Sequence, residues 1–163
     1  MIQYTLTEKA KELEAKGIAI RPIRGTPNSA GLDLAACIDE PVNIYPGTIT
    51  KIPTGIKLFL GEKEWGSDIL QIKLAGFYLP RSSNTELVLA NTVGTLDCDF
   101  QGESFLKVTA RENSFTINPG DRIAQLVITL AVMNEPLEVE SFTTETIRGE
   151  GGDGSTGNNY VHR

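Results

Sequence analysis

The chain has 163 residues, of which 40% are hydrophobic and 22% charged, and its formal net charge is -6. This length and composition are typical of one globular domain that is long enough to bury a core. The negative charge argues against a protein whose main task is to coat nucleic acid. We therefore expect no nucleic-acid partner. No apolar run approaches the roughly 20 residues that span a bilayer, so we expect no membrane partner either.

The rarer residue types narrow the chemistry further. The single histidine, His162, lies next to the C-terminus, which argues against a Ser-His-Asp triad or a His-rich metal site. Cys37 and Cys98 lack the spacing of metal ligands, and the N-terminus lacks the basic start and apolar centre of a signal peptide. We therefore interpret the cysteines as free thiols and expect a cytoplasmic protein, in a bacterial cell or in a virus-infected host cell.

The first predicted element is a short helix, and strands follow it. Residues 5–8, Thr-Leu-Thr-Glu, resemble a capping box, Leu6, Ala10 and Leu13 follow at helical spacing, and Gly17 can end the helix. Beyond it, short β-branched runs alternate with Gly, Pro and Asn, which predicts strands. The predicted strands cover residues 42–45, 51–60 with a break at 53–55, 69–79, 87–90, 104–110, 114–117, 123–133 and 137–142.

This pattern favours an all-β fold, a distorted jelly-roll-like β-barrel with one short N-terminal helix. Strands do not alternate with long helices, so a Rossmann-type fold is disfavoured. From Arg148 the composition becomes glycine-rich, which is typical of a mobile end but also suits a lid over a site. We predict a single barrel domain over residues 1–147 and a flexible C-terminal lid segment over residues 148–163.

Two polar blocks stand in the first half of the chain. Asp33 lies in a strand-like apolar run, where an unpaired carboxylate would be costly. It is therefore either an acceptor for backbone amides or a residue that holds water around a magnesium ion. Residues 80–83, Pro-Arg-Ser-Ser, place an arginine and two hydroxyl groups at a turn, which suits a phosphate contact or a solvated loop.

Three more blocks follow. Residues 97–102, Asp-Cys-Asp-Phe-Gln-Gly, predict a β-hairpin turn in which Asp97 can act as a general base toward water. Residues 119–122, Pro-Gly-Asp-Arg, predict a turn in which Arg122 is paired to a carboxylate, and Gln125 stands on the strand after it. The tail combines Arg148 with glycine amides and two hydroxyl groups, a set that can hold an anion.

These five blocks, in this order, resemble the five motifs of the trimeric dUTP pyrophosphatases (dUTPases), from about Arg21 to Gly157. The resemblance implies a jelly-roll-like barrel and a homotrimer whose three active sites are each built from three subunits. It implies hydrolysis of dUTP to dUMP and pyrophosphate. That reaction limits uracil in DNA and supplies dUMP for dTMP synthesis.

The resemblance also implies the site residues. Asp97 activates the water that attacks the α-phosphorus in line, and Phe100 lies under the deoxyribose, where it excludes a 2′-hydroxyl. Mg²⁺ is held mainly by the substrate phosphates and reaches Asp33 through water. The other implied contacts are Arg81, Ser82, Ser83 and Gln125 with the phosphates, Arg148, Ser155 and Thr156 with the γ-phosphate, and Asn91, Gly94 and Leu96 with uracil.

Three features depart from the family pattern. Asp153 stands where the fifth motif usually has an aromatic residue that stacks on uracil. Residues 67–79 form a longer stretch than usual and residues 84–86 a shorter one, which predicts a differently shaped phosphate loop. Cys98 stands where a small polar residue is commoner, and we expect little effect from it.

Two alternatives remain. A dCTP deaminase shares the fold, but this sequence places Lys107 where that enzyme carries its catalytic glutamate, and a lysine cannot serve as that base. The second alternative is a dUTPase-like interaction protein with weakened turnover, which Asp153 motivates. The combination of Asp97, Arg81 and Gln125 argues against it, because a pure scaffold would not need these side chains.

Overall fold

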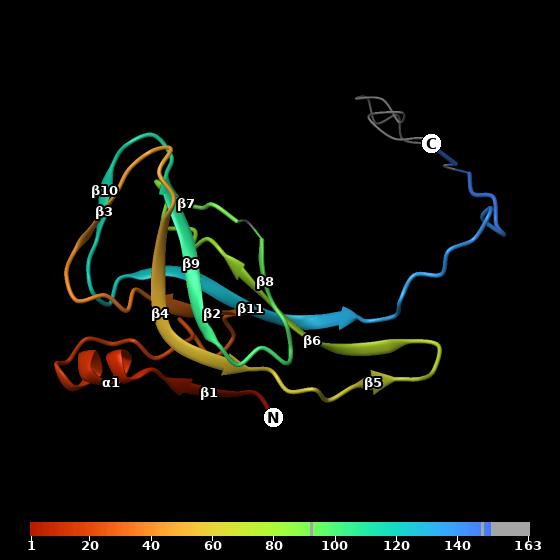
Figure 1. Cartoon of the computed structure of the whole chain (residues 1–163), viewed down its shortest axis with the longest axis horizontal. Helices are drawn as coiled ribbons and strands as arrows, with labels where there is room; N and C mark the ends of the chain where they lie inside the picture. Colours follow the sequence, from red (N-terminus) through yellow and green to blue (C-terminus); the bar gives the residue numbers. More distant parts are fainter. Residues whose placement is uncertain (92, 148, 151–163) are drawn as a thin grey trace.

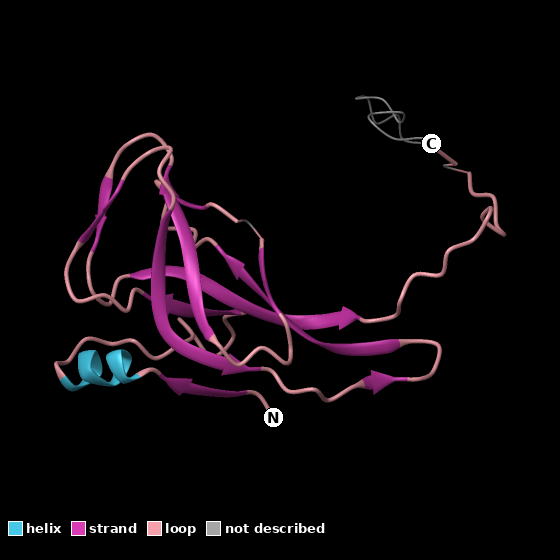
Figure 2. Cartoon of the chain, in the orientation of Figure 1, coloured by secondary structure: helices cyan, strands magenta, loops and turns pink. Residues whose placement is uncertain are grey.

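The structure is a computed structural model, and it describes residues 1–91, 93–147 and 149–150. It confirms a mostly β fold with one short helix (Figures 1 and 2). The elements in the described part are β1 (Gln3–Leu6), α1 (Glu8–Ala15), β2 (Gly31–Ala35), β3 (Val42–Ile44), β4 (Thr50–Phe59), β5 (Trp65–Gly66), β6 (Gln71–Leu79), β7 (Leu87–Leu89), β8 (Gly94–Leu96), β9 (Glu103–Ala110), β10 (Phe115–Ile117) and β11 (Arg122–Val132). None of the described helices is long and apolar enough to cross a membrane.

Two antiparallel sheets enclose the main core. One has the strand order β1-β4-β9-β7, and the other has the order β2-β11-β6-β5, with β8 also paired to β6. A two-stranded sheet, β10-β3, lies beside them. Strand β9 shows why these residues form a sheet, because its alternate side chains, from Ser104 to Ala110, are buried while Phe105 and Lys107 are exposed. Both large sheets therefore contribute one apolar face to the core.

The helix begins two residues later than predicted. Its N-cap is Thr7, whose hydroxyl accepts a bond from the Ala10 amide at 3.2 Å, so the prediction of a cap at Thr5 was wrong. Thr5 instead belongs to β1, where it pairs with Lys57 of β4. This ladder keeps the chain extended up to Leu6, and the helix then buries Ala10 and Leu13. Gly17, at φ +86°, ends the helix as expected.

Strand β4 runs through the predicted break at residues 53–55. The pairing of β4 with β9 shifts register between Pro53 and Lys57, so the Pro-Thr-Gly segment forms a bulge within one strand. Gly55 has φ +70°, and a Cβ there would overlap Cys37 and Ala10. A side chain at this position would therefore separate the helix from the barrel.

The predicted hairpin at residues 97–102 is also different in the structure. Strand β8 pairs with β6, whereas β9 pairs with β4 and β7, so this segment crosses from one sheet to the other. We call residues 97–102 the crossing segment. A turn bond from the Phe100 amide to the Asp97 carbonyl shapes it, and the Cys98 carbonyl accepts a bond from the Gly61 amide.

The end of the chain departs from the prediction as well. Residues 137–142 form no strand, and the described chain after β11 extends away from the barrel (Figure 1). The predicted lid segment falls almost wholly on residues that the structure does not describe, so the division at residue 147 stays a prediction. Cys37 and Cys98 are free and buried, which confirms the prediction of free thiols.

Candidate active site

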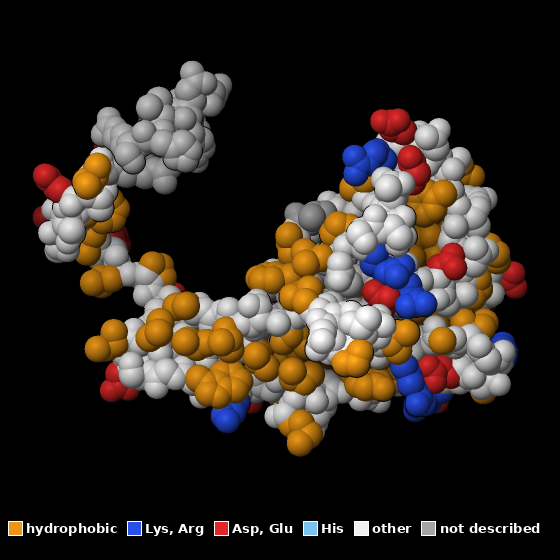
Figure 3. Space-filling model, turned by 180° about the vertical axis from the view of Figure 1, so that it is seen from behind, with side chains coloured by type: hydrophobic (Ala, Val, Ile, Leu, Met, Phe, Trp, Pro, Cys, Tyr) orange, Lys and Arg blue, Asp and Glu red, His pale blue; other side chains and the backbone are white. Residues whose placement is uncertain are grey.

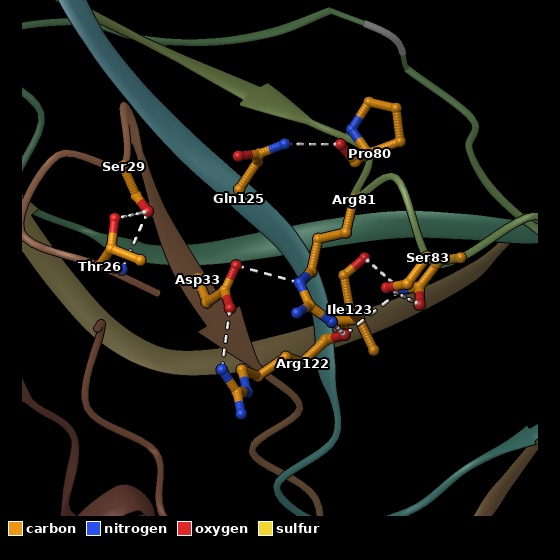
Figure 4. Close-up of polar contacts among 10 residues, drawn as sticks. Thr26, Ser29, Asp33, Pro80, Arg81, Ser83, Arg122, Ile123 and Gln125 are labelled. Atoms are coloured by element: carbon orange, nitrogen blue, oxygen red, sulfur yellow. Dashed lines mark hydrogen bonds and ion pairs between the residues drawn. The ribbon is translucent and has the colours of Figure 1, made fainter. Parts of the chain in front are cut away.

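One cluster of predicted site residues gathers around Asp33. Its Oδ1 accepts a bond from Nε of Arg81 at 3.0 Å, and its Oδ2 lies 3.1 Å from Nη1 of Arg122 (Figure 4). Only 13% of the Asp33 side chain is exposed. The carboxylate is thus mostly buried and pairs with two arginines, and these ion pairs offset the cost of burying its charge.

The sheet register brings these residues together. In the ladders of β11, Gln125 lies opposite Asp33 of β2 on one side and Leu79 of β6 on the other. Its side-chain amide donates to the Pro80 carbonyl at 3.0 Å, and Nη1 of Arg81 donates to the Arg122 carbonyl at 3.1 Å. Three segments that are far apart in the sequence are therefore fixed against one another.

A cavity of about 200 Å³ opens at this cluster. We call it the arginine cavity, and its lining residues are Gly25, Ser29, Gly31, Asp33, Arg81, Ser82, Ser83 and Gln125. Position 31 requires glycine, because the Gln125 side chain lies so close to the backbone there that a Cβ would overlap it. A guanidinium, several hydroxyl groups and a carboxamide make this cavity suitable for a phosphate group.

A second cavity, of about 320 Å³, lies at the crossing segment. We call it the aspartate cavity, and its lining residues are Tyr78, Asn91, Gly94, Thr95, Leu96, Asp97, Phe100, Glu103, Ser104 and Phe105. Asp97 and Phe100 are exposed, whereas Tyr78 and Ser104 are buried. The cavity therefore has a polar, solvent-facing mouth with a carboxylate and an aromatic ring, which suits a nucleoside held next to an activated water.

The predicted site residues thus divide into two groups of five within one chain. Asp33, Arg81, Ser82, Ser83 and Gln125 line the arginine cavity, and Asn91, Gly94, Leu96, Asp97 and Phe100 line the aspartate cavity. The two cavities share no lining residue. The three remaining predicted contacts, Arg148, Ser155 and Thr156, lie outside the described residues.

Sequence reasoning missed three residues at these cavities. Arg122 was predicted only as a turn residue paired to a carboxylate, and that carboxylate is Asp33 of the arginine cavity. Tyr78 and Ser104 carried no signal, because each stands in an apolar strand and its polar partner is 26 residues away. Burial raises the pKa of the Tyr78 phenol, and its bond to Ser104 acts in the opposite direction.

The donor set fits a metal ion that is held through water. Among the described residues, no three His, Cys, Asp or Glu side chains gather into a metal cage. Each oxygen of the Asp33 carboxylate accepts one arginine bond and keeps a further lone pair, which can accept a bond from a metal-bound water. Mg²⁺ keeps several of its waters and is commonly held by substrate phosphates, so this arrangement suits it.

Comparison with known proteins decides the family. The dUTPase family model matches residues 18–157. The chain belongs to the dUTPase family. A relative from Legionella pneumophila (strain Paris), named deoxyuridine 5′-triphosphate nucleotidohydrolase, is 44% identical over 142 residues, which cover 83% of this chain and 86% of the relative. A relative of the same name from Burkholderia cenocepacia (strain HI2424) is 40% identical over 151 residues, covering 90% and 95%.

Solved dUTPase structures share the fold. The dUTPase of Staphylococcus bacteriophage 80alpha with dUpNHpp aligns with a TM-score of 0.73 at 24% identity, covering 96% of this chain and 98% of that one. A mutant dUTPase from phage phi11 of S. aureus, whose structure shows the coordination of a structural Mg(II) ion, aligns with a TM-score of 0.66 at 22% identity, covering 88% of this chain and 99% of that one. The jelly-roll-like barrel predicted from the strand pattern is thereby confirmed.

Within this family, Lys107 argues against the deaminase alternative. It lies on the exposed face of β9, opposite Lys51 of β4, and lines neither cavity. A catalytic acid-base residue must lie within hydrogen-bond reach of the bound base. The position that the resemblance assigns to the glutamate of a deaminase is thus occupied here by a lysine that lines neither cavity.

Proposed function

We propose that this dUTPase-family chain hydrolyses dUTP to dUMP and pyrophosphate. The observation that carries the proposal is the position of Asp97, an exposed carboxylate at the mouth of a nucleoside-sized cavity that Asn91, Gly94, Leu96 and Phe100 also line. In this role Asp97 accepts the proton of the water that attacks the α-phosphorus in line. The proposed location is the cytoplasm, in a bacterial cell or in a virus-infected host cell, and the bacterial origin of the named relatives supports the bacterial cell.

In this proposal, strand β8 recognises the base. Within the described residues, β8 pairs with β6 through one edge and with no strand through its other edge. Between Gly94 and Leu96, the main-chain donors and acceptors on the unpaired edge are therefore free to match uracil and to mismatch cytosine. The Phe100 ring packs close to Gly102, and under the deoxyribose it would leave no room for a 2′-hydroxyl.

Phosphate recognition falls to the arginine cavity. Arg81 supplies charged donors, Ser82 and Ser83 supply hydroxyl groups, and Gln125 supplies a carboxamide. Arg148, Ser155 and Thr156 would add the γ-phosphate contacts. Mg²⁺, bridged by the phosphates and linked to Asp33 through water, would supply charge neutralisation at the phosphates.

The proposed active form is a homotrimer with shared sites. The separation of the two cavities supports it, since in the described part of the chain neither cavity is lined by both Asp97 and Arg81. The arm formed by β5 and the adjoining ends of β6 and β11 also carries exposed apolar side chains, among them Leu130 at 62% and Val132 at 64% (Figure 3). Exposed apolar area of this kind is typical of subunit contacts.

Isotope labelling tests the reaction. In H₂¹⁸O, attack at the α-phosphorus places the heavy oxygen in dUMP, whereas attack at the β-phosphorus places it in pyrophosphate. We expect dUMP and pyrophosphate as the two products, with the label in dUMP alone by mass spectrometry. Label in pyrophosphate would contradict the assigned role of Asp97 at the α-phosphorus.

Subunit mixing tests the shared site. Asp97→Asn and Arg81→Ala chains, each expected to have little activity alone, are unfolded together at equal concentration and refolded. If each site takes Asp97 from one subunit and Arg81 from another, random assembly restores about a quarter of the sites. A mixture no more active than its components would show that each site lies within one chain.

A further inference from the structure

The aspartate cavity has an exposed mouth and a buried floor. Phe100 at the mouth is 43% exposed, whereas Tyr78 and Ser104 are 9% and 5% exposed. A charged phosphate chain stays with water and cations, and a flat ring is better accommodated at the buried end. A nucleotide in this cavity therefore places its base toward Tyr78 and Ser104.

A short hydrogen bond closes this floor. The Tyr78 hydroxyl and the Ser104 hydroxyl are 2.5 Å apart, and both are buried. Tyr78 stands on β6 and Ser104 on β9, so the bond joins the two large sheets at the cavity. The Ser104 carbonyl also accepts a bond from the fully buried Thr54 hydroxyl at 2.7 Å. The floor is thus fixed from three strands and cannot easily give way.

The Tyr78 ring also supports the strand assigned to the base. Gly94 lies directly opposite Tyr78 in the ladder between β8 and β6. A Cβ on Gly94 would lie 3.2 Å from the ring carbon Cδ2, so the ring packs against the backbone at that residue. Moving or shortening Tyr78 would therefore change both the depth of the cavity and the support of β8.

We propose that the Tyr78–Ser104 pair determines base specificity, because it sets a floor that admits an unsubstituted pyrimidine and rejects one with a 5-methyl group. The inference rests on the proposed function, in which this cavity holds the base of dUTP. Packed interiors respond to a change of one methyl group, and a floor fixed by a buried hydrogen bond relaxes little. Neither residue belongs to the five sequence blocks.

The test is the double variant Tyr78→Phe/Ser104→Ala. It removes two oxygen atoms and no carbon, which frees about the volume of a methyl group without leaving one hydroxyl unpaired. The ratio of kcat/KM for dTTP to that for dUTP should rise about tenfold or more, since a methyl group in a closed pocket discriminates by roughly 10–200-fold. The matched control is Tyr45→Phe/Ser114→Ala, whose side chains are exposed and line neither cavity, and its ratio should equal that of the wild type.

Equal loss on both substrates, with an unchanged ratio, would show a merely structural role and overturn the inference. If the double variant does not fold, Ser104→Ala alone is measured and should raise the same ratio, though less. Calorimetric binding of dUMP and dTMP to the same proteins gives a readout without turnover. The wild type should prefer dUMP and the double variant should lose that preference. A wild type that binds dUMP selectively without hydrolysing dUTP would contradict the proposed function while supporting the floor.

Discussion

The Asp33 carboxylate fixes the orientation of Arg81. It accepts a bond from Nε at 3.0 Å, and the Arg122 carbonyl accepts one from Nη1 at 3.1 Å. These bonds use two of the five N–H groups of the guanidinium, so three remain for an anion in the arginine cavity. Arg122 pairs with the other oxygen of Asp33, so the three side chains together keep one net positive charge, and the cavity is preorganised before substrate binds.

Asp33→Asn should therefore weaken both the fold and phosphate binding. The amide keeps the shape of the side chain but loses charge-assisted bonds to two arginines, and we expect a loss of about 1–3 kcal/mol of unfolding free energy. Urea denaturation measures it, and KM for dUTP should rise. The control is Glu64→Gln, which breaks the more exposed 3.7 Å pair with Lys73 and should cost less than about 0.5 kcal/mol. Similar losses for the two variants would contradict this account of Asp33.

Asp97→Asn should retain dUTP binding and lose turnover. The amide keeps the size of the side chain but cannot accept the proton of the attacking water, so we expect a fall of roughly 10²–10⁴-fold in kcat. Pyrophosphate release and calorimetric binding give the two numbers. Asp99→Asn is the matched control, because Asp99 stands in the same crossing segment but does not line the aspartate cavity. A near-normal kcat for Asp97→Asn would remove Asp97 from the role of base.

Gly31→Ala should impair the arginine cavity through Gln125. The added methyl group would occupy the space of the Gln125 carboxamide and force that side chain away from the Pro80 carbonyl. We expect a higher KM for dUTP, with a fall of roughly tenfold or more in kcat/KM. Gly25→Ala is a useful comparison, because its new methyl would meet only the Ser29 hydroxyl at 3.5 Å, an ordinary contact. If Gly31→Ala has no greater effect than Gly25→Ala, Gln125 does not depend on this close approach.

Glu14 should contribute to the pH dependence of stability. Its Oε1 accepts bonds from the Arg21 amide at 2.9 Å and the Ile20 amide at 3.2 Å. Burial acts to raise the pKa of this carboxyl, but the bonds from Arg21 and Ile20 outweigh it and lower the pKa below its ordinary value of 4.5. The stabilisation is therefore fully present above that value and is lost as the pH falls through the lowered pKa.

Glu14→Gln should accordingly cost about 1 kcal/mol of unfolding free energy at neutral pH. The difference from the wild type should narrow as the pH falls from 4.5 through the lowered pKa, because this carboxyl is protonated first in the unfolded chain and then in the folded one. Thermal or urea unfolding across this range measures it. A difference that stays constant with pH would mean that the charge of Glu14 does not contribute.

Features that depend on neighbouring residues could be predicted from the sequence. Strand β11 was predicted from its apolar run, and ten of the site residues predicted from the five polar blocks line two cavities. The pairing of strands was harder to predict, because the sequence of a three-residue strand such as β8 does not indicate which strand it pairs with. The crossing segment was therefore predicted as a hairpin, although β8 and β9 belong to different sheets.

Residue preference also led to a wrong prediction of the helix N-cap. Thr5 and Thr7 are both good capping residues, and only the ladder between β1 and β4 excludes Thr5. The bond between Tyr78 and Ser104 joins two sheets, so neither strand alone could indicate it. Long-range pairing, rather than residue preference, decides these features.

The most direct test of the central claim is pyrophosphate release from dUTP, dCTP, dTTP and UTP, each with magnesium and with a chelator. We expect hydrolysis that is selective for dUTP and depends on magnesium, despite Asp153 in the glycine-rich tail. Equal hydrolysis of all four nucleotides would contradict the assignment of the aspartate cavity to uracil and deoxyribose. If dUTP binds but is not hydrolysed, the proposed enzymatic function would be contradicted. An interaction protein built on a dUTPase barrel would then be favoured.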